Sequence, residues 1–243
     1  MMPVTSRTPW LWVPSLYFGQ GLPYVVAMTL AVIMYKNLGV SNTDIALYTS
    51  WLYLPWVIKP LWSPVVDLFR TKRFWIVTLQ LVVGAALAAV ALTLPLPHYF
   101  QLTLAAFWLV AFASATHDIA ADGFYMLALP QHQQAAFVGV RSTFYRVAMI
   151  TGQGALVYLA GTVGERTGDL KLAWTIVFWV LAGLFVLLFA YHRWALPVPD
   201  SDRAVRGGHG MVAEFVATFT SFFARQDILG VIAFLLLFRL GEA

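Results

Sequence analysis

Long apolar blocks, separated by short polar segments, are the main pattern along the chain. A helix needs about 20 mostly apolar residues to cross a bilayer core about 30 Å thick. The blocks therefore predict six membrane-spanning helices, near residues 10–35, 44–66, 74–95, 100–128, 135–161 and 172–193. A further apolar block begins at Asp227 and predicts the start of a seventh span.

The composition agrees with this pattern. Hydrophobic residues make up 60% of the 243 residues and charged residues 11%, and the mean hydropathy is +0.76. Soluble domains carry about 25% charged residues. We therefore expect an all-α, polytopic membrane protein with the lipid bilayer as a partner. The chain has no cysteine, which excludes disulfides, thiolate nucleophiles and cysteine-ligated zinc.

The basic residues lie at the ends of the apolar blocks and do not form one patch, although the formal net charge is +4. This distribution is typical of membrane topology and argues against a nucleic-acid partner. If the N-terminus is cytoplasmic, the cytoplasmic segments hold most of the flanking cations: Arg7, Arg70, Lys72, Arg73, Arg193, Arg203, Arg206 and Arg225. The opposite segments hold Lys36, Arg166 and Lys171. The positive-inside rule therefore predicts a cytoplasmic N-terminus.

Three parts follow from the spacing of the blocks. Residues 1–195 are expected to form a six-helix bundle, and residues 227–243 to begin the seventh helix. Between them, residues 196–226 form a cytoplasmic linker that is rich in proline and glycine and ends in an amphipathic helix. That helix suits either the membrane surface or packing on protein. A chain that stops inside an apolar helix predicts the first half of a duplicated transporter, which would need its second half as a partner.

Two aspartates stand inside the fourth apolar block, in the stretch ATHDIAADGFY. Asp118 and Asp122 are four residues apart, which puts them on one face of a helix. Each carboxylate at the centre of a membrane helix costs about 2.5–3.5 kcal/mol on insertion scales. We therefore expect both side chains to face a bundle interior or a wet cavity.

Three cations inside predicted spans are candidate partners for these aspartates: Lys59, Arg141 and Arg146. A cation favours the ionised form of a nearby carboxylate, whereas a second carboxylate favours protonation. The cluster therefore predicts a site for proton coupling or substrate orientation, and the alternative is a permanent ion pair between helices. His117 either joins this site or hydrogen-bonds a neighbouring helix. No second histidine or cysteine stands at ligand spacing, so we expect no metal and no cofactor.

Two further motifs suggest moving parts. The segment SPVVDLFRTKR places Asp67 before Arg70, Lys72 and Arg73, so ion pairs there could form a cytoplasmic gate; the alternative is a basic loop that only sets topology. In FGQGLP, Gly19, Gly21 and Pro23 permit either local opening of the first helix or close helix packing. The segment TGQG in the fifth span is similar, and the side-chain amide of Gln153 there is a possible hydrogen-bond donor into a cavity.

Enzyme motifs are absent from the sequence. There is no G-x-x-x-x-G-K-[ST] phosphate loop, no HExxH and no GxSxG. A transporter is therefore favoured over an enzyme. Two rival interpretations are an intramembrane enzyme that uses Asp118 and Asp122 as a catalytic pair, and a purely structural or pore-like membrane protein.

Four stretches together, FGQGLP, KPLWSPVVD, ATHDIAADGFY and LLLFRLGEA, resemble the AmpG-type muropeptide permeases and related acetyl-CoA transporters of the major facilitator superfamily. The resemblance implies the N-terminal six-helix bundle of that superfamily and the beginning of its seventh helix. Departures from the family pattern are His117, where glutamine is common, and the pair Arg239 and Glu242, which replace a lysine and an aspartate.

The resemblance further implies proton-coupled import of muropeptides across the bacterial inner membrane, with Tyr125 and Gln153 among the groups that contact a sugar-peptide substrate. A major facilitator transporter of another substrate, such as acetyl-CoA, a siderophore or a drug-like solute, is the alternative.

Overall fold

The computed structural model describes residues 8–203 and, beyond them, residues 213, 216–217, 220–221, 224–231 and 233–234. All regular structure in these residues is helical, which confirms the all-α prediction. Arg239 and Glu242 lie outside the described residues, as does most of the predicted amphipathic helix. The division into bundle, linker and seventh helix stays a prediction.

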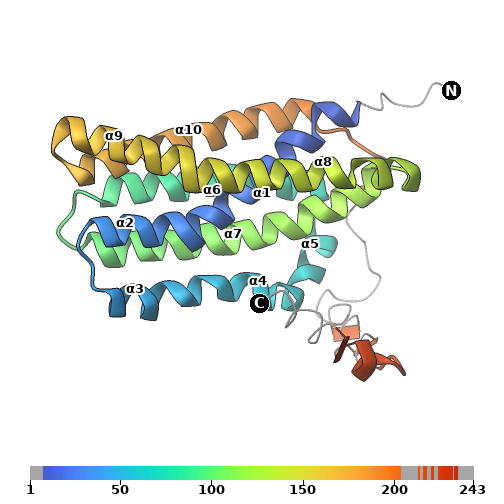
Figure 1. Cartoon of the computed structure of the whole chain (residues 1–243). Coiled ribbons are helices and arrows are strands. Elements are labelled where there is room, and N and C mark those ends of the chain that lie inside the picture. The colour runs from blue at the N-terminus through green and yellow to red at the C-terminus, as the bar shows by residue number, and fades with distance from the viewer. Residues whose placement is uncertain are drawn as a thin grey trace.

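The helices follow one another with short turns (Figure 1). Segments η1, η3 and η4 are 3₁₀ turns, and η2 and η5 are π-helical. In chain order the elements are η1 Pro9–Leu11, α1 Val13–Val25, η2 Val26–Leu30, α2 Ala31–Asn37, α3 Asn42–Thr49, η3 Ser50–Tyr53, α4 Leu54–Ile58, η4 Lys59–Leu61, α5 Ser63–Phe69, α6 Lys72–Thr93, α7 Tyr99–Ala128, α8 Gln131–Ile150, η5 Thr151–Leu156, α9 Val157–Thr167 and α10 Leu170–Ala195.

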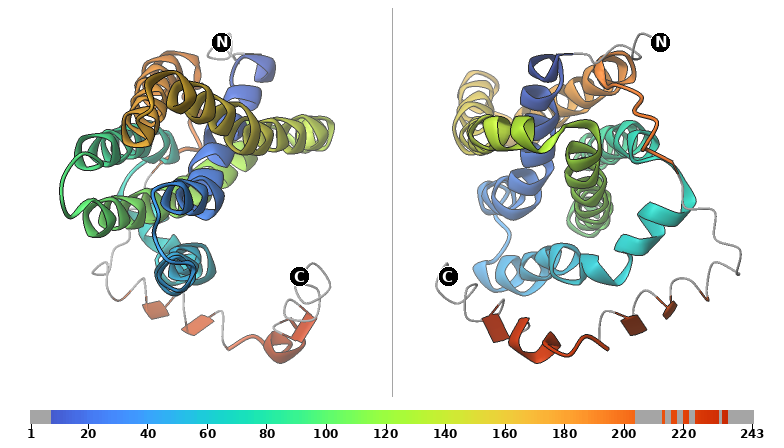
Figure 2. Two further views of the ribbon diagram at one scale, coloured as in Figure 1. Left: turned by 60° about the vertical axis from the view of Figure 1, so that its left-hand side comes forward. Right: turned by 90° about the vertical axis from the view of Figure 1, so that its right-hand side faces the viewer.

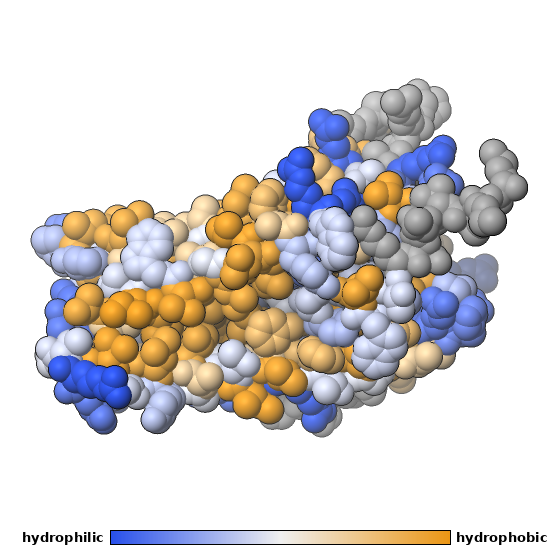
Figure 3. Space-filling view, turned by 90° about the horizontal axis from the view of Figure 1, so that it is seen from above, coloured by the Kyte–Doolittle hydropathy of each residue, from blue (hydrophilic) through white to orange (hydrophobic). Residues whose placement is uncertain are grey.

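Among the residues that the structure describes, five helical runs are long and apolar enough to cross a membrane. They coincide with five of the six predicted spans: Pro9–Asn37, Lys72–Thr93, Tyr99–Ala128, Gln131–Thr167 and Leu170–Ala195. On the face seen in Figure 3, apolar residues spread over the middle of the molecule and hydrophilic residues gather toward its ends. This surface is typical of a bundle that lies across a bilayer.

The expected span at 44–66 is not one continuous helix. The structure divides this stretch into α3, η3, α4, η4 and α5, and it is not among the five long apolar helices. Pro55, Pro60 and Pro64 each stand in the first turn of one of these segments. A proline has no backbone N–H to donate to the preceding turn, so a helix tends to restart at each of them.

The row α3–α5 runs along one edge of the bundle, with α9 and α10 at the opposite edge and α6 and α7 between them (Figure 2). Close packing of α6 against α10 depends on Gly84, where a Cβ would lie 3.2 Å from the Cβ of Phe185. The core between these helices is apolar and aromatic, with Phe107, Trp174 and Phe178 fully buried.

The glycine-rich first helix stays helical throughout. Pro23 is followed directly by η2, so the helix changes to a π-helical stretch instead of opening. At Gly21 the backbone lies against α8, since a Cβ there would be 2.9 Å from the Cβ of Ala148 and 3.0 Å from the carbonyl oxygen of Tyr145. Gly19 is equally buried, beside Leu188. The structure therefore favours close packing over local opening.

Candidate functional site

Helix α7 places Asp118 and Asp122 on one face and His117 on another. Asp118 and Asp122 each bind a cation from a different helix, whereas His117 is only 4% exposed and lies in the core. The two carboxylates thus have the inward orientation that the sequence predicted.

Asp118 pairs with Lys59. The Nζ–Oδ2 distance is 3.5 Å, and the side chains are 34% and 14% exposed for the lysine and the aspartate. Lys59 begins η4, so it comes from the proline-rich stretch that the structure breaks into short segments. The indole N–H of Trp62 donates to Thr116 Oγ1 at 3.2 Å and holds this stretch against α7. Lysine and aspartate therefore meet although 59 residues separate them.

Asp122 pairs with Arg141 of α8. The Nη2–Oδ1 distance is 2.8 Å, and the hydroxyl of Tyr17 donates to the same oxygen at 3.1 Å. The guanidinium lies 4.5 Å from the ring centroid of Tyr17 and 5.0 Å from that of Tyr125. Tyr125 in turn donates its hydroxyl to the carbonyl of Gln134. Two aromatic rings and a carboxylate therefore fix the position of this arginine.

Two cavities border these ion pairs. One, of about 540 Å³, is lined by Tyr24, Tyr53, Trp56, Val57, Lys59, Asp118 and Tyr145. The other, of about 430 Å³, is lined by Tyr17, Gln20, Arg141, Ser142, Tyr145, Arg146 and Met149. Because Tyr145 lines both, the cavities adjoin. Polar groups that converge on such a concave surface are typical of small-molecule sites.

Not all the predicted residues take part equally. Arg146 lines the second cavity, but within residues 8–203 no carboxylate lies at ion-pair distance from it. Gln153 is exposed in η5 and lines neither cavity. The sequence did not single out Gln20 or Tyr17, which lie on the face of α1 that meets the aspartates.

His117 belongs to a buried hydrogen-bond chain. Its Nε2 lies 3.3 Å from Nε2 of Gln80, and the amide of Gln80 reaches Nδ1 of His192 at 2.8 Å. Nε2 of His192 lies 3.0 Å from the hydroxyl of Ser15. Gln80 and His192 are 0% exposed. The chain joins α1, α6, α7 and α10, and among the described residues no three His, Asp or Glu gather to hold a metal.

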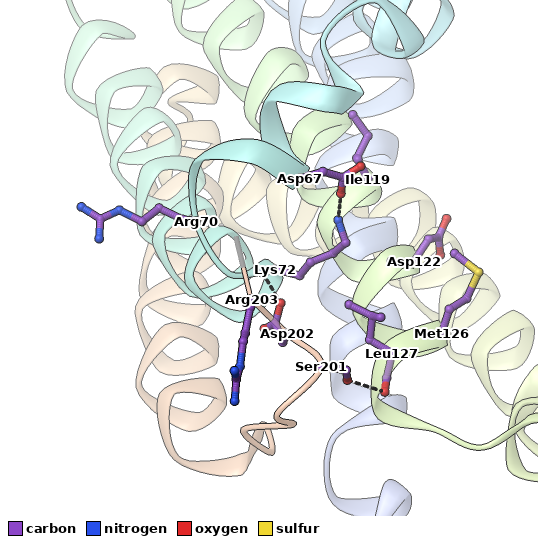
Figure 4. Close-up of a pocket in the computed structure, with 11 residues that line it drawn as sticks. Asp67, Arg70, Lys72, Ile119, Asp122, Met126, Leu127, Ser201, Asp202 and Arg203 are labelled. Carbon is purple, nitrogen blue, oxygen red and sulfur yellow. Dashed lines mark hydrogen bonds and ion pairs between the residues drawn. The ribbon is translucent and has the colours of Figure 1, made fainter. Parts of the chain in front are cut away.

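The loop before α6 contains an ion pair and two other contacts of basic residues (Figure 4). Asp67 pairs with Lys72, one of the three cations that follow it in the sequence. Arg70 turns away and places its guanidinium 5.5 Å from the ring centroid of Phe74. Arg73 donates to the carbonyl of Arg193 at the end of α10. Lysine reaches the carboxylate because it stands in the first turn of α6, beside the end of α5.

Asp202 makes polar contacts with the start of α6 that we did not predict from the sequence. Its carboxylate accepts hydrogen bonds from the backbone N–H groups of Lys72 at 2.7 Å and Arg73 at 3.0 Å, and the residue is 7% exposed. Acidic groups stabilise the N-terminus of a helix, where backbone N–H groups have no partner within the helix. The start of the linker is thereby attached to the first turn of α6, at the edge of a cavity of about 500 Å³ (Figure 4).

A family model and several known proteins are similar in sequence to this chain. A family model described as Major Facilitator Superfamily matches residues 15–241. The anhydromuropeptide permease of Escherichia coli (strain K12) is 27% identical over 240 residues, which cover 93% of this chain and 44% of the permease. A Rickettsia conorii protein that carries the AmpG name is 26% identical over 243 residues, covering 92% and 54%. An uncharacterised Haemophilus influenzae protein is 26% identical over 234 residues, covering 93% and 52%.

The chain spans about half the length of the curated relatives it matches. It is a multi-pass membrane protein by its apolar helices. Because the family model covers far more than half of the sequence, the chain belongs to the Major Facilitator Superfamily.

Proposed function

We propose that the protein is a secondary transporter that imports anhydromuropeptides together with protons across the bacterial inner membrane. The observation that carries this proposal is the pair of ion pairs, Lys59–Asp118 and Arg141–Asp122, beside two adjoining cavities. Ionisable groups within membrane helices are costly and in general mark ion or substrate pathways. The muropeptide is proposed because the Escherichia coli relative is named for it.

The two aspartates act together in this mechanism. They stand one helical turn apart, so the ionisation of one affects the other, and the proton belongs to the pair. Protonation weakens the contact to Lys59 or Arg141 and frees that cation. Substrate binding and proton binding then favour the same conformation, which is what coupling requires.

The remaining parts of the proposal concern the surroundings of this site. The N-terminus lies in the cytoplasm, because most flanking cations fall on that side of the spans. A second bundle of six helices covers the cavity face of α1, α7 and α8, and the two halves rock around the substrate. Asp67, Lys72 and Asp202 hold the cytoplasmic end of the first half together in one of the two conformations.

Uptake into proteoliposomes tests the proposal. The protein, in the full length that its gene encodes, is reconstituted and offered a labelled anhydromuropeptide with and without an inward pH gradient. We expect uptake that the gradient drives and that the double variant Asp118→Asn, Asp122→Asn loses. The matched control is Asp200→Asn, since Asp200 is exposed and distant in sequence from the site.

Other results would refute the proposal. Equal uptake by the double variant would remove the aspartates from coupling. Uptake that ignores the gradient would indicate a pore or a uniporter, and chemical conversion of the substrate would indicate an enzyme.

A further inference from the structure

Aromatic side chains dominate the cavity around Lys59 and Asp118. Tyr24 and Trp56 meet edge to face with ring centroids 5.1 Å apart, and Tyr53 stacks on Trp56 with centroids 6.5 Å apart. A pyranose ring has a face of C–H groups that packs on an aromatic ring and a rim of hydroxyls that hydrogen-bond charged groups. Aromatic walls together with one ion pair therefore suit a sugar.

The adjoining cavity has a different chemistry. Arg141 is held by Asp122 and by two tyrosine rings, so it is already neutralised. Arg146 has no carboxylate partner among residues 8–203, although it stands in a helical run long and apolar enough to cross a membrane. An arginine presents a planar fork that matches a carboxylate. Within the described part of the chain, this cavity therefore has a cation without a carboxylate partner, which suits an anionic group of a ligand.

A second observation in the same cavity points to a ligand. Gln20 is 6% exposed, and its Oε1 has no hydrogen-bond partner among the residues that the structure describes. The side-chain amide of Gln20 lies beside Asp118, and because a carboxylate only accepts, the amide N–H group is the one that suits this neighbour. A buried acceptor without a partner is unfavourable until a donor arrives. An amide N–H beside a carboxylate, as at the end of a peptide, supplies both missing partners.

We propose that the two cavities are separate subsites of one ligand site: the cavity of Tyr24, Tyr53 and Trp56 binds a pyranose ring, and the cavity of Gln20 and Arg146 binds a peptide carboxylate with its adjacent N–H. This inference rests on the proposed function. Tyr145 lines both cavities, so the two subsites adjoin. A sugar that carries a peptide through one covalent link has the same order of groups.

Binding by isothermal titration calorimetry tests the division. The probes are an anhydromuropeptide with free peptide carboxylates and the same molecule with those carboxylates amidated. For the unsubstituted protein we expect amidation to weaken binding about tenfold, because a charge-assisted hydrogen bond is lost. Arg146→Gln should bind the free acid about tenfold more weakly and no longer respond to amidation. Trp56→Ala should weaken both probes equally and keep the response to amidation.

Matched controls and conservative variants keep the test interpretable. Arg166→Gln and Trp51→Ala remove the same side-chain types from exposed positions that line neither cavity, and they should bind as the unsubstituted protein does. If Arg146→Gln or Trp56→Ala does not fold, Arg146→Lys and Trp56→Phe should give the same pattern with smaller losses.

The outcomes separate this inference from the function on which it rests. Failure of the unsubstituted protein to bind or take up the muropeptide would refute the proposed function and the subsites with it. Binding and uptake combined with an undiminished amidation effect in Arg146→Gln would refute the arginine subsite alone. A loss in Trp56→Ala that is confined to the free acid would refute the sugar subsite alone.

Discussion

The two sides of α7 hold their polar groups under opposite conditions. On the cavity side, Asp118 and Asp122 pair with Lys59 and Arg141, and the four side chains are between 14% and 41% exposed. Asp122 and Arg141, at 41% and 30% exposed, keep part of their hydration, so their pairing adds little to stability. Such groups can change partner at low cost.

On the core side the polar groups are dry and satisfied. His117, Gln80 and His192 are at most 4% exposed and hydrogen-bond one another, with Ser15 at the end of the chain. A buried polar group without a partner is costly, so each member depends on its neighbours. We infer that this network fixes the rotation of α7, and the fixed rotation points Asp118 at the aromatic cavity and Asp122 at Arg141.

The largest effect on stability is expected from Gln80→Leu. The change leaves two buried histidines without the amide that joins them, and each unsatisfied group costs about 1–3 kcal/mol. We expect the free energy of unfolding to fall by about 2–5 kcal/mol, measured in detergent as a lower thermal midpoint. Gln101→Leu, at an exposed position of α7, is the matched control and should change little. A stable Gln80→Leu protein would show that the network is dispensable.

A second prediction concerns the contact of α1 with α8. Gly21→Ala places a Cβ within 3.0 Å of α8, so the helices must separate, at a cost of about 1–3 kcal/mol. Gly154→Ala adds the same methyl group in η5, where nothing lies within 4 Å, and should be neutral. Equal thermal midpoints for the two variants would mean that α1 and α8 move apart without cost. That result would favour local opening of α1 over close packing.

A smaller effect is expected at the start of α6. Asp202→Ala removes both acceptors at the start of α6, and loss of such a helix cap costs about 1 kcal/mol. Asp200→Ala removes an exposed aspartate two residues earlier and is the control. Hydrogen exchange at the amides of Lys72 and Arg73 reports the change locally. Unchanged protection of these amides would contradict the contact.

The sequence was sufficient to identify charged side chains that are unfavourable within an apolar block. Asp118 and Asp122 stand out because carboxylates at helical spacing within an apolar block are unfavourable wherever they face lipid, so they must face the bundle interior or a wet cavity. The sequence left three cations as possible partners for these aspartates. The pairing of Asp118 with Lys59 depends on how the chain folds back between the two residues, and local sequence pattern does not encode that fold.

Other features were hidden for physical reasons. Gln80 is one amide in an apolar block, and His192 lies beside basic residues at a helix end, so neither looked unusual. Asp202 caps a helix that begins 130 residues earlier. The continuous span predicted at 44–66 was based on hydropathy alone. Hydropathy does not take into account that a helix tends to restart at each proline.

The smallest change in stability, combined with a large change in transport, is expected for Asp122→Asn. Its side chain is 41% exposed, so loss of the pair with Arg141 should lower the free energy of unfolding by less than about 1 kcal/mol. Gradient-driven uptake should nevertheless fall at least about tenfold, because the amide cannot exchange a proton. Thermal unfolding and proteoliposome uptake of one preparation give both values. If Asp122→Asn unfolds as readily as Gln80→Leu, the ion pair holds the helices together permanently, and the two sides of α7 serve the same structural purpose.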